Sequence, residues 1–227
     1  MKKLIISDYN RLPYDISTTW INKYFGDNYL IYDRYHRFEE SDKIKHQVDV
    51  GVNIYDIFDF VETNYDDLPD ICVFCKDDVI PRHCSIEKFE SIINNIDFTP
   101  IENYIRNTPL YSPDIYSYVT ENDEYYENSF EVNYTVSNIY PGKYFHSYQD
   151  LLKHIFKNPV FGEYIRFAPG GNYLIPKHNL LKYNRFFYSK MREYVSWTER
   201  PGEAYLFERA LYSIFNSDYV INDIYKY

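Results

Sequence analysis

The stretch Ile71-Cys72-Val73-Phe74-Cys75-Lys76-Asp77-Asp78 decides the fold. Its first five residues form an uninterrupted apolar run, which is typical of a central strand buried on both faces. The pair Asp77 and Asp78 ends the run, so we expect the strand to lead into a loop that carries two carboxylates. Residues three positions apart on a strand point to opposite faces. Cys72 and Cys75 are therefore predicted to be separate buried thiols rather than a zinc-binding pair.

Upstream of this stretch the pattern alternates between strands and helices. Residues 3–7 form a short β-rich run that breaks into Asp8-Tyr9-Asn10-Arg11, as a buried strand ending in a loop would. A helix is expected over 17–25, a second strand over 28–33 and a charged connection over 34–47. After Gly51 the apolar residues change from strand spacing to helical spacing. Ile54, Ile57, Phe58 and Val61 recur at helical spacing, with Asn53 near the helix start.

Downstream, Ser85 is predicted to cap a helix whose inner side carries Ile86, Phe89 and Ile93. The acidic, Tyr-rich segment 108–144 predicts only a strand or hairpin within 130–140. The remaining predicted elements are a helix at 148–156, strands at 164–167 and 173–175, and helices at 184–195 and 202–215. Strands and helices that alternate with short links predict an α/β fold, with a central, mostly parallel mixed sheet flanked by helices. We expect a single domain over residues 1–227.

The composition narrows the class of function. A net charge of −10 argues against non-specific binding of nucleic acid or anionic lipid, because both require a basic face. Three cysteines without a secretory leader favour a reducing compartment, so a cytoplasmic location is expected. No apolar stretch approaches the ~20 residues needed to cross a bilayer, so no membrane span is expected.

Candidate ligand-binding residues follow the predicted strands, because open α/β sheets bind ligands beyond the carboxyl ends of parallel strands. The segments of interest are therefore 7–11, 33–37 and 76–83. Asp77 and Asp78 could hold Mg²⁺ or Mn²⁺ and so neutralise a pyrophosphate leaving group, or they could simply be turn residues. Basic side chains that suit phosphate gather near two strand ends. They are Arg34, Arg37, Lys43 and Lys45 after the second strand, and Lys76, Arg82 and His83 around the acidic pair. Each of them could equally be a solvated surface charge.

Two later segments also offer chemistry. Gly170 and Gly171 would let the backbone approach a ligand closely, although a turn between strands needs the same residues. Glu203 and Glu208 fall on apolar faces of the last helix, where either could be a general base. The competing interpretation is that Glu203 favours the helix N-terminus and Glu208 pairs with an arginine. Motifs of zinc hydrolases, esterases, P-loop proteins and dinucleotide-binding proteins are absent from the sequence.

Five segments together resemble a known family: VGVNIYD (50–56), NYDDLPD (64–70), VFCKDDVIPRHC (73–84), PGGNYLIPK (169–177) and PGEAYLFERA (201–210). They are similar to the small glycosyltransferases of large algal (chlorella) viruses that glycosylate the major capsid protein, and to related bacterial proteins. The resemblance implies a glycosyltransferase A-type fold and metal-assisted sugar transfer from a nucleoside-diphosphate sugar, with UDP favoured. The acceptor would be a glycan or glycoprotein, such as a capsid protein, and a viral enzyme would act in the host cytoplasm.

The resemblance also assigns residues. The family's Asp-x-Asp metal motif falls on Lys76-Asp77-Asp78, where lysine replaces the first acid, so Asp78 is the expected ligand of Mn²⁺ or Mg²⁺. Asp77 and His178 are its expected companions. Catalysis is assigned to Asp78, Glu203 and Glu208. The residues expected to bind the donor are Ser7, Tyr9, Asn10, Asp33, Arg37, Lys45, Gly51, Asn53, Lys76, Asp77, Arg82, Gly170 and Gly171.

Two other functions fit the same sequence. A non-catalytic carbohydrate-binding or assembly protein could use some of the 28 tyrosines as stacking platforms. A metal-dependent phosphodiester hydrolase could use Asp77, Asp78 and His83 around an ion.

Overall fold

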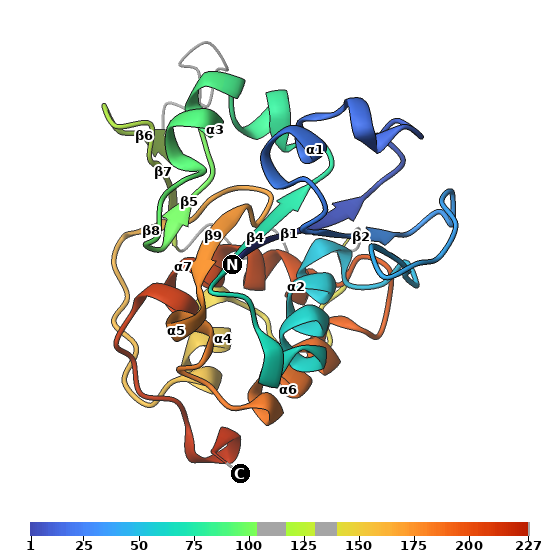
Figure 1. Ribbon diagram of the computed structural model, residues 1–227. Helices are drawn as coiled ribbons and strands as arrows, with labels where there is room; N and C mark the ends of the chain where they lie inside the picture. Colours follow the sequence, from blue (N-terminus) through green and yellow to red (C-terminus); the bar gives the residue numbers. More distant parts are fainter. Residues whose placement is uncertain (104–116, 130–139, 227) are drawn as a thin grey trace.

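A six-stranded mixed sheet forms the centre of the molecule (Figure 1). The computed structural model describes residues 1–103, 117–129 and 140–226. In spatial order the strands are β3 (Ile44–His46), β2 (Tyr29–Asp33), β1 (Lys2–Asp8), β4 (Ile71–Lys76), β9 (Tyr173–Pro176) and β5 (Thr99–Pro100). The first four run parallel, whereas β9 is antiparallel to both of its neighbours. The expected α/β class with a mixed, mostly parallel sheet is confirmed.

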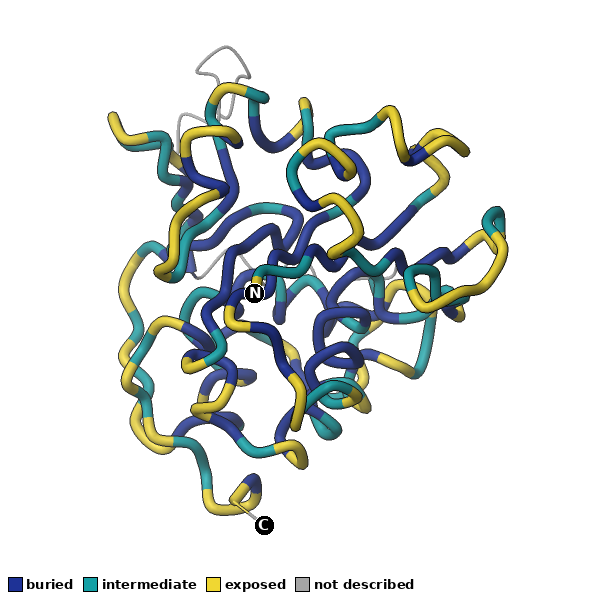
Figure 2. The backbone as a smooth tube through the Cα atoms, in the orientation of Figure 1, coloured by how far each residue is buried: buried dark blue, intermediate teal, exposed yellow. Residues whose placement is uncertain are grey.

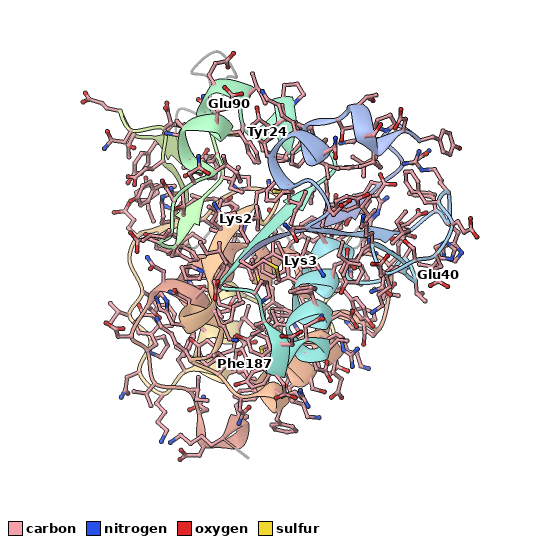
Figure 3. All side chains as sticks on the ribbon, viewed as in Figure 1. Lys2, Lys3, Tyr24, Glu40, Glu90 and Phe187 are labelled. Atoms are coloured by element: carbon pink, nitrogen blue, oxygen red, sulfur yellow. The ribbon has the colours of Figure 1, made fainter. Side chains whose placement is uncertain are left out.

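Helices cover both faces of this sheet. They are α1 (Trp20–Phe25), α2 (Val52–Thr63), α3 (Ile86–Ile92), α4 (Tyr148–Ile155), α5 (Lys177–Leu180), α6 (Arg185–Val195) and α7 (Gly202–Asn216), with short 3₁₀ turns at Ile16–Thr18, Tyr65–Asp67 and Asp223–Tyr225. Figure 1 shows α1 and α3 on one face and α2 with α4 to α7 on the other. Tyr24 of α1 and Glu90 of α3 lie close together above the sheet (Figure 3), where the tyrosine hydroxyl donates to the carboxylate.

Side-chain caps fix several helix starts where the sequence indicates them. The Ser85 hydroxyl accepts the backbone N–H of Lys88 at 3.2 Å, and Asn184 accepts that of Phe187 at 2.9 Å. Helix α2 begins differently. Gly51 precedes it with φ +62° and makes no side-chain cap, so this helix start depends on glycine's freedom to adopt positive φ.

Strand β4 divides the core into two layers. Cys72 and Phe74 belong to the larger layer, which packs against α2, α4, α6 and α7, while Val73 and Cys75 belong to the layer under α1 and α3. Figure 2 shows this central strand as continuously buried backbone. Cys72 and Cys75 are free and buried, as predicted, and Cys84 is free and buried as well. The alternation of a strand therefore sends each apolar side chain of β4 into one of two separate cores.

A second sheet of three strands lies beside the main body. It contains β6 (Ser117–Val119), β7 (Tyr125–Asn128) and β8 (Tyr164–Arg166). Glu127 of β7 faces inward and binds Arg209 of α7, with 3.0 Å between Oε1 and Nε. Both side chains are almost fully buried, so this ion pair anchors the small sheet to the last helix.

The structure contains short strands that the sequence did not predict, among them β5 (Thr99–Pro100). The connection 34–47 contains β3, whose three partly buried residues are too few to show an alternating pattern. Strands β6 and β7 form a hairpin that the acidic, Tyr-rich composition did not indicate. The hairpin predicted within 130–140 lies outside the described residues, apart from Tyr140. Among the residues that the structure describes, no helix is both long and apolar enough to span a membrane.

Candidate functional site

A cavity of about 400 Å³ opens where β1, β2 and β4 end. The loop after β1, the loop after β2, the end of β4, the start of α2 and the approach to α7 all contribute to its wall. The residues that line it are Tyr9, Arg11, Tyr35, Val52, Lys76, Asp78, Arg82, Arg200 and Tyr205. Four of them are cations and one is an acid. The cavity therefore lies where open α/β sheets bind ligands, and its charge is opposite to that of the whole chain.

Two aspartates hold the loop after β1 in place. Asp8 Oδ1 accepts the backbone N–H groups of Asn10 and Arg11 at 3.1 and 3.2 Å. Asp77 Oδ2 accepts those of Tyr9 and Arg11 at 2.7 and 3.1 Å. Burial and the nearby carboxyl of Asp8 raise the pKa of Asp77, the backbone N–H groups of Tyr9 and Arg11 oppose the shift, and the resulting pKa is about 6. Asp77 thus acts on the shape of the loop and does not line the cavity.

Asp78 is engaged by two guanidinium groups. Its Oδ2 binds Arg11 and also Arg82, the latter at 2.8 Å from Nη1. Its Oδ1 is buried without a hydrogen-bond partner and lies 3.9 Å from Nε2 of His83. Burial, together with the positive charge of Lys76, lowers the pKa of His83 to about 4, so this ring is neutral at pH 7.

Lys76 and Tyr9 form the floor of the cavity. The Lys76 ammonium lies 3.9 Å from Glu208 Oε2 and 6.0 Å from the centroid of the Tyr9 ring. Burial lowers the pKa of Lys76, and the negative charge of Glu208 opposes that shift. The Tyr9 hydroxyl is buried and lacks a hydrogen-bond partner, so a bound ligand could provide one.

Arg34, one of the predicted basic residues, does not line the cavity but contacts Val52, which does. Its fully buried side chain binds Asp56 at 2.8 Å and Asp49 at 3.1 Å, and it donates to the backbone carbonyl of Val52. Val52 has φ +48°, a conformation that a β-branched residue rarely adopts. The buried guanidinium thus stabilises a strained residue at the edge of the cavity.

Several of the expected donor-binding residues make internal contacts instead of lining the cavity. Asp33 accepts the N–H groups of Tyr35 and Phe38, and Arg37 binds Asp8 at 2.6 Å, so both shape the loops around the site. The others are accounted for as follows: Ser7 donates to Asp56, Asn10 is an exposed loop residue, Lys45 pairs with Asp59, Asn53 donates to the carbonyl of Gly170, and Gly51, Gly170 and Gly171 all have positive φ. Gly170 packs against His83, because a Cβ there would lie 3.1 Å from its ring.

Two of the expected catalytic and metal residues lie away from the cavity. Glu203 is fully buried, and its Oε1 accepts the backbone N–H groups of Lys143 and Tyr144 at 2.5 Å each. It holds a loop and is not placed to act as a base. His178 is exposed and follows β9, whose last residue pairs with Ile71 at the amino end of β4. The expectation that His178 joins Asp78 at a metal is wrong, because the antiparallel direction of β9 puts it at the opposite edge of the sheet.

The donor set around Asp78 does not suit a divalent cation. Asp78 Oδ2 is already bound to Arg11 and Arg82. Lys76, the last residue of β4, adds another positive charge to the cavity. Asp78 Oδ1 and the neutral His83 ring leave two donors, in a wall that carries four positive charges. Within the described ranges, no group of three or more His, Cys, Asp or Glu side chains is arranged to hold a metal. The arrangement fits an anion better than a cation.

Five cavity residues were not assigned to the site from the sequence: Arg11, Tyr35, Val52, Arg200 and Tyr205. The rule that ligands bind at strand ends did select the segments that contain the first two, since each lies two or three residues beyond a strand. It could not have found Arg200 and Tyr205, which reach the cavity from the start of α7. No protein-family model, curated protein or solved structure matches this chain. The resemblance to viral glycosyltransferases therefore stays a prediction, as does the specific glycosyltransferase A-type fold.

Proposed function

We propose that this protein is a glycosyltransferase that moves a sugar from a nucleoside-diphosphate sugar, most simply a UDP-sugar, to a glycan or glycoprotein acceptor. One observation carries the proposal: an acidic chain gathers Arg11, Lys76, Arg82 and Arg200 in one cavity at the carboxyl edge of parallel strands. Guanidinium and ammonium groups at that position suit a diphosphate.

The aromatic residues of the cavity suit the rest of such a donor. Tyr9, Tyr35 and Tyr205 bring rings to the same wall as the cations. Aromatic faces can stack on a nucleobase or a sugar ring, and the unpartnered Tyr9 hydroxyl can bind a polar edge. In this assignment the cations bind the diphosphate of the donor, and the tyrosines bind its nucleobase and its sugar.

Glu208 is the better placed of the two expected bases. It lies on α7 one turn beyond Tyr205, and its carboxylate is 3.9 Å from the Lys76 ammonium. A carboxylate there can take the proton of an acceptor hydroxyl as the hydroxyl oxygen attacks the anomeric carbon. Glu208→Gln should therefore lower the rate of transfer by about a hundred-fold or more while leaving donor binding nearly unchanged.

The direct test is to incubate the protein with a panel of nucleotide-sugars and to measure release of the nucleoside diphosphate with and without saccharide acceptors. Slow release that an acceptor accelerates supports the transferase. Release of a nucleoside monophosphate with no response to acceptor would indicate a phosphodiester hydrolase. Glycan binding without any turnover would indicate a carbohydrate-binding protein. Either of these last results refutes the proposal.

A further inference from the structure

The charges of the cavity indicate how the proposed transferase would bind the diphosphate of its donor, an inference that rests on the proposed function. Within the described lining, the positive side chains surround the single acid Asp78 instead of lying apart from it. Asp78 contacts Arg11 and Arg82 at once, although these residues come from the loops after two different strands. The carboxylate therefore holds two guanidinium groups next to each other at the mouth of the cavity.

Lys76 adds a third cation from a different depth. Its side chain is 23% exposed, whereas those of Arg11 and Arg82 are 51% and 62% exposed. The ammonium thus sits on the floor and the guanidinium groups sit at the rim. Three cations at two depths can contact a diphosphate from two sides.

A divalent ion would have to enter this field of positive charge. Two unit charges of the same sign repel by about 4 kcal/mol at 4 Å near a protein surface, and the repulsion doubles when one charge is divalent. Its only carboxylate ligand in the described lining would offer a single unpartnered oxygen, Asp78 Oδ1, because Oδ2 is bound by two guanidinium groups. A diphosphate meets the opposite situation, since each of these cations attracts it.

We infer that Arg11, Lys76 and Arg82 themselves, with no divalent metal ion, neutralise the diphosphate of the donor, and that Asp78 positions the two arginines. In the transfer step the bond between the anomeric carbon and the diphosphate oxygen breaks, and its electron pair stays on that oxygen. The acceptor oxygen forms the new bond to the anomeric carbon, and its proton passes to Glu208. The three cations stabilise the charge that develops on the departing diphosphate.

The test measures binding by calorimetry on EDTA-treated protein, with UDP, GDP, CDP, ADP and inorganic pyrophosphate as probes. Each titration is run in excess EDTA and again in excess Mn²⁺. We expect at least one nucleoside diphosphate, and pyrophosphate, to bind in EDTA. Excess Mn²⁺ should not tighten this binding and should weaken it where the ion occupies the diphosphate in solution. Lys76→Met and Arg82→Met should each weaken binding by about ten-fold or more in EDTA. Lys157→Met, which removes a surface lysine paired with Asp223, is the matched control and should bind as the unmodified protein does.

Asp78→Asn separates the two roles of this residue. If Asp78 positions the arginines, the amide oxygen of asparagine can still accept from a guanidinium group while the cavity loses a negative charge, so binding in EDTA should stay within about three-fold of the unmodified protein or become tighter. Thermal melting of each variant shows whether it is folded. Binding that requires Mn²⁺ and is lost in Asp78→Asn would overturn the inference and leave the proposed function standing. If no nucleoside diphosphate binds in either condition, both the inference and the proposed function fail.

Discussion

Replacing Asp77 by asparagine should stabilise the protein at neutral pH, because the carboxylate is held where it is costly to ionise. Burial and the neighbouring Asp8 raise the pKa of Asp77 from 3.8 to about 6. Between these two values the folded state binds more protons than the unfolded state, so the free energy of unfolding falls as the pH rises through this window. At pH values above both, the shift of about two units corresponds to about 3 kcal/mol of lost stability.

Asparagine keeps the useful contacts without the charge. Its amide oxygen can accept the N–H groups of Tyr9 and Arg11 that Asp77 Oδ2 accepts, and its amide nitrogen can donate to Asp8. Of the stability of about 3 kcal/mol that the raised pKa of Asp77 costs in total, about 2 kcal/mol should be lost between about pH 4.5 and pH 7.5. We therefore expect the free energy of unfolding of Asp77→Asn, relative to the unmodified protein, to be about 2 kcal/mol larger at the higher pH than at the lower one.

Urea unfolding at about pH 4.5 and about pH 7.5 measures this difference directly. Both values avoid the isoelectric point near 5.1, where solubility is lowest. Asp67→Asn, at an exposed position, is the control and should change the free energy of unfolding equally at both pH values. The reasoning is refuted if Asp77→Asn shows the same relative stability at both pH values, or is less stable at the higher one.

Three further predictions follow from the site and its supports. Glu203→Ala leaves two partly buried backbone N–H groups without their acceptor and should lower the free energy of unfolding by about 2 kcal/mol in denaturation measurements. Glu203→Gln should keep most of the stability, and most of the transfer activity in rate measurements. Gly51→Ala should destabilise by at least about 2 kcal/mol in urea unfolding, since a Cβ would lie 2.5 Å from the carbonyl oxygen of Val195 and φ is +62°. The pKa of His83 is lowered from 6.5 to about 4, so its NMR signals should stay constant from about pH 7 to pH 5. Because the unfolded state binds the proton first, the free energy of unfolding should decrease as the pH falls from about 6.5 through 4.

The elements of the fold were predictable where one local rule dominates. The apolar run at 71–75 gave β4, and the caps Ser85 and Asn184 gave the starts of α3 and α6 at the expected places. The alternation of β4 also placed Cys72 and Cys75 in different cores. Short strands such as β3 and β5 were missed because their pairing depends on neighbours distant in the sequence, which local composition does not reveal.

The site was only partly predictable for the same reason. Strand ends located Tyr9, Lys76, Asp78 and Arg82 at the cavity. The pairing of Asp78 with Arg11 joins segments 67 positions apart, and no local pattern indicates it. His178 was misplaced because an apolar run predicts a strand without fixing its direction in the sheet.

The aspartates at this edge explain how an acidic chain makes a positive cavity. Asp8, Asp33 and Asp77 each accept backbone N–H groups of the loops that follow β1 and β2. A carboxylate used in this way fixes a loop, and its charge is balanced by several amide dipoles instead of facing the ligand. Asp78 is the acid that reaches the described lining, and it binds two arginines there. Acidic residues after a buried strand are therefore weak evidence for a metal site, because the same residues can build the loops that present cations to a phosphate.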